Sequence, residues 1–88
     1  MISNQQISEN KTIDARTFPE IWESCTSIER SKISHKVAEL LDCSTVAVWN
    51  YGVGNYAPKA LSAKKDVVRV LRNVLKIQTS PETLFPAK

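Results

Sequence analysis

The sequence predicts a small all-α domain of four or five short helices. Apolar residues recur at helical spacing in several segments, and residue types that begin helices stand before most of them. No segment alternates apolar and polar residues clearly enough to predict a strand. The chain has 88 residues, of which 42% are hydrophobic and 24% charged. These values are typical of one globular domain with a modest core.

The first helix is predicted over residues 18–26. Thr17 can cap it, Glu20 stands three residues later as the partner in a capping box, and Pro19 is tolerated in a first turn. Four apolar residues follow at helical spacing: Phe18, Ile21, Trp22 and Cys25. Phe18 and Trp22 are expected in the core.

A second helix is predicted over residues 34–42, and residues 26–32 fit either a turn or an early start to it. Its apolar face is formed by Ile33, Val37, Ala38, Leu40 and Leu41.

The third helix is short, over residues 45–51. Ser44 is a good N-cap, and Gly52 and Gly54 are expected to end the helix. A loop over residues 53–61 follows, in which Pro58 favours an extended backbone.

The last helix is predicted over residues 63–77 with Ser62 as its cap. Its apolar stripe consists of Val67, Val70, Leu71, Val74 and Leu75. Core packing is the expected use of this stripe, and a dimer seam is the alternative. We expect residues 1–14 to be a flexible arm, residues 15–78 to form the domain and residues 79–88 to be a tail.

Charge is distributed unevenly along the chain. The net charge is −3 over residues 1–29 and +6 over residues 30–88. This allows an anionic partner for the second segment. Four basic residues of the last helix fall in one stripe: Lys65, Arg69, Arg72 and Lys76. The stripe fits contact with phosphates or an acidic partner, or simply a solvated face.

Several function classes have little support. No run has the length of a membrane span and Met1 precedes polar residues, so a cytoplasmic location is expected. One histidine and two separated cysteines make no zinc pattern, and no cofactor or metal is expected. Cys25 and Cys43 are interpreted as small buried apolar residues, with a disulfide as the minor alternative. No catalytic residue is predicted, since nothing places His35 beside either thiol, and His35 is expected to be exposed.

Residues 34–58 resemble the helix-turn-helix of the phage repressor and Cro family. That family has a small residue where its two helices cross, matched by Ala38, and often a serine cap on the recognition helix, matched by Ser44. Its apolar positions correspond to Val37, Leu41, Cys43, Val48 and Tyr51. Its frequent W-x-x-G-x-x-x-P ending corresponds to residues 51–58, with tyrosine in place of tryptophan.

The resemblance has two departures and two possible registers. Asp42 stands where the family usually has a left-handed glycine, a conformation that aspartate tolerates. Trp49 points towards DNA in the ungapped register, where a large aromatic residue is unusual. A gapped register matches W-x-x-G to residues 49–52 and buries Val46 and Trp49 instead. We favour the ungapped register.

The resemblance implies a lambda-repressor-like fold that binds double-stranded DNA. The implied protein is a transcriptional regulator of the phage- or mobile-element-type repressor or Cro-like class, a homodimer with residues 44–51 in the major groove. Expected base contacts are Ser44, Thr45, Val46, Trp49 and Asn50, and expected phosphate contacts are Asn55, Lys59, Lys64 and Lys65.

For these positions a plainer interpretation remains open. Asn50 can pair with adenine, and Val46 or the methyl group of Thr45 can meet a thymine methyl group. Alternatively, Thr45 and Asn50 are ordinary solvent-facing residues and Trp49 belongs to the core. For the whole chain, the chief alternative is a protein-interaction or architectural module that uses the same fold without recognising sequence.

Overall fold

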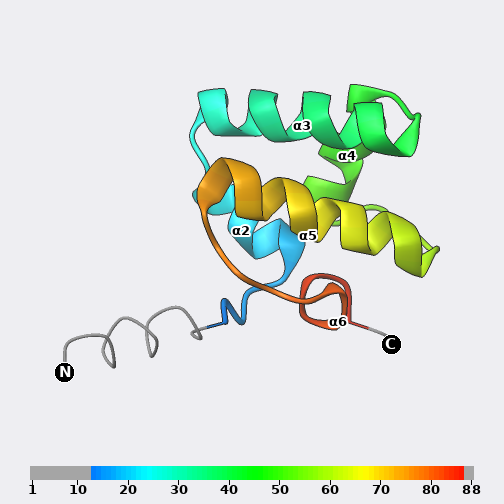
Figure 1. Ribbon diagram of the computed structural model, residues 1–88. Coiled ribbons are helices and arrows are strands. Elements are labelled where there is room, and N and C mark those ends of the chain that lie inside the picture. Colours follow the sequence, from blue (N-terminus) through cyan, green and yellow to red (C-terminus); the bar gives the residue numbers. More distant parts are fainter. Residues whose placement is uncertain (1–12, 87–88) are drawn as a thin grey trace, which may run out of the picture.

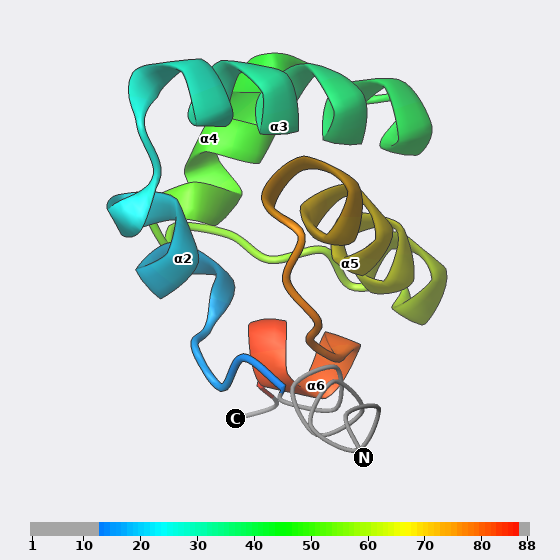
Figure 2. The same cartoon turned by 60° about the vertical axis from the view of Figure 1, so that its left-hand side comes forward.

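The computed structural model describes residues 13–86, which form five helices and no strand, as predicted. The helices are α2 (Phe18–Ser24), α3 (Ser27–Leu41), α4 (Thr45–Gly52), α5 (Leu61–Leu75) and α6 (Pro81–Leu84). Figure 1 shows α3 running beside α5, with α2 and α4 behind α5 and the short α6 below. Figure 2 shows the same arrangement from the side of α2.

The core gathers apolar side chains from all five helices. Each helix contributes at least one apolar side chain with no exposed surface, among them Phe18, Ile33, Val48, Leu71 and Leu84. Each such side chain contributes about 1.5–3 kcal/mol to the free energy of unfolding. The ring of Phe18 lies between the rings of Trp22 and Phe85, with centroid distances of 5.8 and 5.6 Å. The predictions that Phe18 and Trp22 lie in the core are therefore confirmed.

Two capping boxes determine where α2 and α3 begin. Thr17 and Glu20 form the predicted box at the start of α2. Thr26 and Glu29 form a second box at the start of α3, which therefore includes residues 27–33. Because Thr26 serves as that cap, α2 ends at Ser24, two residues before its predicted end.

Helix α5 begins and ends two residues earlier than predicted, at Leu61 and Leu75. Its cap residue is Ala60, so Ser62 lies inside the first turn and is not the cap. Val67, Val70 and Leu71 are buried in the core of this chain. The predicted core packing is confirmed, and these side chains are not free to form a dimer seam.

The prediction of a tail over residues 79–88 is wrong for residues 80–85. Ser80 caps α6 by accepting a hydrogen bond from the Thr83 amide, and Pro81 occupies the first turn. Leu84 and Phe85 are buried, because α6 packs against α5. Most of the predicted arm lies outside the described residues. Within the described part, the Asp14 amide donates to the Gln78 carbonyl at 2.7 Å.

The two cysteines are free thiols beside the core, each half-buried. Cys25 lies between α2 and α3, and Cys43 lies between α3 and α4. His35 is exposed, as predicted, and its Nδ1 donates to the Ser31 carbonyl at 2.8 Å. No helix within residues 13–86 has the length and apolar character needed to cross a membrane.

Candidate nucleic-acid interface

A three-residue turn fixes the direction of α4 relative to α3. Asp42 adopts a left-handed conformation, φ 55° and ψ 50°, as the aspartate-for-glycine comparison predicted. The amides of Asp42 and Cys43 both donate to the Ala38 carbonyl, which satisfies the end of α3. Ser44 then caps α4, its Oγ accepting from the Ala47 amide at 3.1 Å. The buried Ala38 lies one turn before this junction.

The pattern of burial along α4 separates the two registers. Val48 is fully buried and Tyr51 packs partly against the core. Val46 is 66% exposed and Trp49 is 43% exposed. This is the pattern of the ungapped register, whereas the gapped register requires Val46 and Trp49 to be buried. Trp49 is thus not a core residue.

The end of α4 has two glycines with different structural roles. Gly52 is the last residue of α4 and lies directly under the ring of Trp22. Its role is therefore close packing, whereas we had expected it to end the helix. Gly54 has a φ of +87°, the backbone conformation that terminates a helix and favours glycine. Pro58 is buried in the following loop. Tyr51, Gly54 and Pro58 therefore have the burial and backbone geometry expected from the W-x-x-G-x-x-x-P comparison.

Trp49 is exposed but held in place. Its ring makes an edge contact with Trp22, at 4.9 Å between centroids and 82° between planes. Arg30 lies over the same Trp22 ring at 5.7 Å, and its Nε donates to the Trp22 carbonyl at 2.9 Å. These three side chains line a hollow of about 330 Å³ at the outer face of α4. Arg30 was not among the predicted site residues, because its segment fits either a turn or a helix.

The side-chain amide of Asn50 is already bonded within the protein. Its Nδ2 donates to the Val46 carbonyl and its Oδ1 accepts from Asn55 Nδ2, each at 3.1 Å. Releasing two such bonds costs about 1–3 kcal/mol. A bidentate pair with adenine is worth about 1–3 kcal/mol of discrimination. The two terms nearly cancel, so the structure weakens the case for Asn50 and Asn55 as DNA contacts.

Thr45 and Ser44 are the other polar candidates on α4. Ser44 is exposed, but its oxygen is committed to the cap. Thr45 is half-buried, and its hydroxyl makes no side-chain hydrogen bond with any of residues 13–86. Thr45 therefore keeps its hydroxyl and methyl groups available for a ligand.

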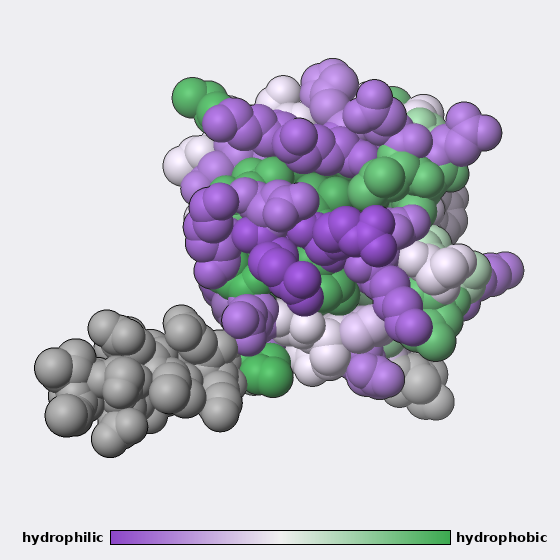
Figure 3. Space-filling view, viewed as in Figure 1, coloured by the Kyte–Doolittle hydropathy of each residue, from purple (hydrophilic) through white to green (hydrophobic). Residues whose placement is uncertain are grey.

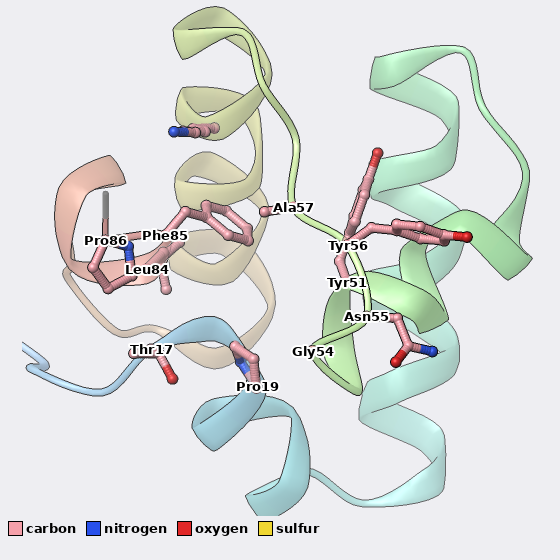
Figure 4. Close-up of a pocket in the computed structure, with 11 residues that line it drawn as sticks. Thr17, Pro19, Tyr51, Gly54, Asn55, Tyr56, Ala57, Leu84, Phe85 and Pro86 are labelled. Carbon is pink, nitrogen blue, oxygen red and sulfur yellow. The ribbon is translucent and has the colours of Figure 1, made fainter. Parts of the chain in front are cut away.

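The three candidate lysines surround the start of α5 but face different hollows. Lys64 lines a pocket of about 430 Å³ whose two walls are the α4–α5 loop and the segment around α6 (Figure 4). Lys59 lies beside Leu40 and Ala60 in a second hollow. Lys65 lies with Arg69 and Arg72 in a third. The structure therefore does not gather these lysines into one patch.

The basic stripe of α5 faces away from α4. In Figure 3, which has the view of Figure 1, hydrophilic side chains cover α5, and α4 lies behind that helix. Lys65, Arg69 and Arg72 are exposed there, and Arg69 pairs with Asp66 at 3.5 Å. An exposed pair of this kind contributes little to stability. A ligand on the outer face of α4 would not reach the far end of the stripe.

Residues 43–65, which include α4 and the following loop, contain no aspartate or glutamate but three lysines. Two neighbouring side chains, Tyr51 and Cys43, are neutral at physiological pH. Burial raises the pKa of the Tyr51 phenol, and burial, with a smaller contribution from Asp42, raises the pKa of the Cys43 thiol. Helix α4 and the loop after it therefore carry no negative charge, although Glu23 of α2 lines the hollow beside Trp49 together with Arg30.

No cluster of three or more histidine, cysteine, aspartate or glutamate side chains suited to a metal ion occurs within the described range.

No protein-family model matches this chain, and neither a curated protein nor a solved structure matches it. The functional assignment therefore depends on the sequence resemblance and on the geometry of α4.

Proposed function

We propose that the chain binds double-stranded DNA in a sequence-specific manner, with α4 in the major groove, and regulates transcription. The burial pattern of α4 carries this proposal. Val48 and Tyr51 point inward, while Val46 and Trp49 point outward. This is the division that a recognition helix of the phage repressor and Cro type requires.

Three further observations support a helix-turn-helix. The junction between α3 and α4 contains a left-handed residue, Asp42, and a capping serine, Ser44. Gly54, two residues after the last residue of α4, has a positive φ. Helix α4 itself carries no acidic residue that would repel phosphates. The length of α3, 15 residues, exceeds the eight or so that the resemblance led us to expect.

The proposal includes a homodimer on a two-fold site, acting as a repressor of the phage or mobile-element type. Such proteins place two recognition helices about one turn of DNA apart. The apolar face of α5 is used within the chain, so a dimer contact would involve another surface. Sedimentation of the protein with and without its selected DNA site tests this part of the proposal.

The experiment that tests the function is selection from a random duplex pool, followed by mobility-shift titration at several salt concentrations. We expect one enriched sequence, and an affinity that falls steeply with salt as several counterions are displaced. Lys59→Ala and Lys64→Ala should weaken binding to enriched and random DNA alike, because phosphates carry no sequence. A folded protein that binds no duplex at low salt would rule out the proposal.

One observation favours a protein-interaction module as the second candidate function. Val46, Trp49 and Val53 are all exposed and apolar, and such clusters also occur at protein interfaces. Binding to such a partner would depend little on salt and would require no DNA. The same salt titration therefore separates the two functions.

A further inference from the structure

Building on the proposed function, we propose that α4 recognises thymine through its methyl group. Val46 and Trp49 would contact the C5 methyl groups of thymine in the major groove. Hydrogen bonds from Asn50 to adenine would contribute little. The preferred DNA site would therefore be defined mainly by the positions of thymines in its sequence.

The residues of α4 leave few other means of base recognition. Guanine is recognised chiefly by arginine or lysine, and cytosine by aspartate or glutamate. Helix α4 carries none of these four residue types. Adenine is recognised by asparagine, but both ends of the Asn50 amide are bonded, to Val46 and to Asn55. The Thr45 hydroxyl can still meet a base edge but discriminates little between bases, so apolar contact with thymine is the main selective contact that the exposed face can make.

Val46 and Trp49 are placed to make such contacts side by side. They are three residues apart on one helix, so they share a face and are separated by about 4.5 Å along its axis. Base pairs are stacked about 3.4 Å apart. The two side chains can therefore address neighbouring base pairs, and with Thr45 beside them they form a mostly apolar surface.

Trp49 does not need to be ordered on binding. Its edge contact with Trp22 holds the ring in one orientation, and Arg30 supports Trp22 from another side. The entropic cost of immobilising this side chain is thus met within the free protein. Arg30 and Glu23 both line the hollow beside the exposed ring, so their opposite charges offset each other there.

The test uses the enriched duplex and the unmodified protein. Each thymine is replaced in turn by deoxyuridine, which removes only the C5 methyl group. We expect affinity to fall about fourfold at each contacted thymine, the equivalent of one methylene-sized group, and to stay unchanged at flanking thymines. Replacing adenines by 7-deazaadenine, which removes the N7 acceptor, should leave affinity unchanged.

Protein variants then assign the contacts. Val46→Ala and Trp49→Ala should each abolish the deoxyuridine effect at one position and keep it at the other. Val53→Ala is the matched control, because Val53 is also an exposed valine but lies beyond the end of α4. It should keep both effects.

The outcomes distinguish this inference from the function on which it rests. An enriched site that is indifferent to every deoxyuridine, or that depends on adenine N7 instead, overturns thymine recognition and leaves DNA binding intact. Failure to enrich any sequence overturns both. Because the DNA substitutions use the unmodified protein, the test stands even if Trp49→Ala fails to fold.

Discussion

Gly52→Ala should destabilise the protein although it replaces a helical glycine by the best helix former. A Cβ atom at this position would lie 2.4, 2.5 and 2.6 Å from Cδ2, Cγ and Cε2 of Trp22. These atoms belong to the rigid part of a ring that is only 3% exposed and that packs against Phe18 and Trp49. The ring must therefore move.

Overpacking of this kind costs about 1–3 kcal/mol. The gain in helix propensity offsets up to about 1 kcal/mol of it. Because the clash is with rigid ring atoms, the cost falls in the upper part of that range, about 2–3 kcal/mol. The net loss is then about 1–2 kcal/mol, which lowers the Tm of a domain this small by roughly 4–16 °C. Thermal melting followed by far-ultraviolet circular dichroism measures it. An unchanged or higher Tm would refute the reasoning.

Gly54→Ala is the matched control, because its Cβ would meet nothing closer than Pro19 Cγ at 3.8 Å. Its cost comes from the positive φ, so Gly54→Asn should cost less than Gly54→Ala. In a Trp22→Phe background, the smaller ring should reduce the penalty of Gly52→Ala and leave that of Gly54→Ala unchanged. Equal penalties for Gly52→Ala in both backgrounds would also contradict the argument.

Three further predictions concern stability. Ala38→Leu should overpack the buried side of α3 and cost about 1–3 kcal/mol in urea unfolding; an unchanged midpoint would place Ala38 outside the packed junction. Asp42→Gly should raise the Tm, because glycine adopts the left-handed conformation without the strain of about 1–2 kcal/mol that most other residues meet there. A hydrogen bond from Arg16 lowers the pKa of Asp14, despite some opposing desolvation. A lowered pKa stabilises the folded state at pH values above the ordinary aspartate pKa of about 4. This stabilisation is lost as the pH falls through the pKa of Asp14 in the folded state. Asp14→Asn should therefore lose less Tm than the parent between pH 6 and pH 2.

Local signals in the sequence predicted much of the fold. The Thr17–Glu20 box and the Ser44 cap were identified because each uses only side chains within one turn of the helix. The left-handed conformation of Asp42 followed from the resemblance, in which a glycine usually holds that position. The outward position of Trp49 came from the resemblance, since apolarity alone would have buried this side chain.

Other features depended on contacts that sequence does not display. The Thr26–Glu29 box was present in the sequence, but no apolar pattern before Ile33 supported an earlier start. Helix α6 has only four residues and is held by the burial of Leu84 and Phe85 rather than by periodicity.

The candidate interface was predicted less completely than the fold. The internal bonds of Asn50 require the loop after α4 to return to that helix, which spacing along the chain does not predict. The lysines near the start of α5 were expected together, because they are close in sequence. Lys64 and Lys65 nevertheless point to different sides of one helix.

The reactivity of the two free thiols can report local unfolding of the turns in which they lie. Cys25 and Cys43 lie in the turns before and after α3, and burial raises the pKa of each thiol. The thiolate attacks the thiol reagent, so the reaction rate at each half-buried site rises when that turn opens and exposes the sulfur. Comparing the two rates therefore follows the two ends of α3 separately, without introducing any label. A ligand that holds α4 in place would slow reaction at Cys43 more than at Cys25.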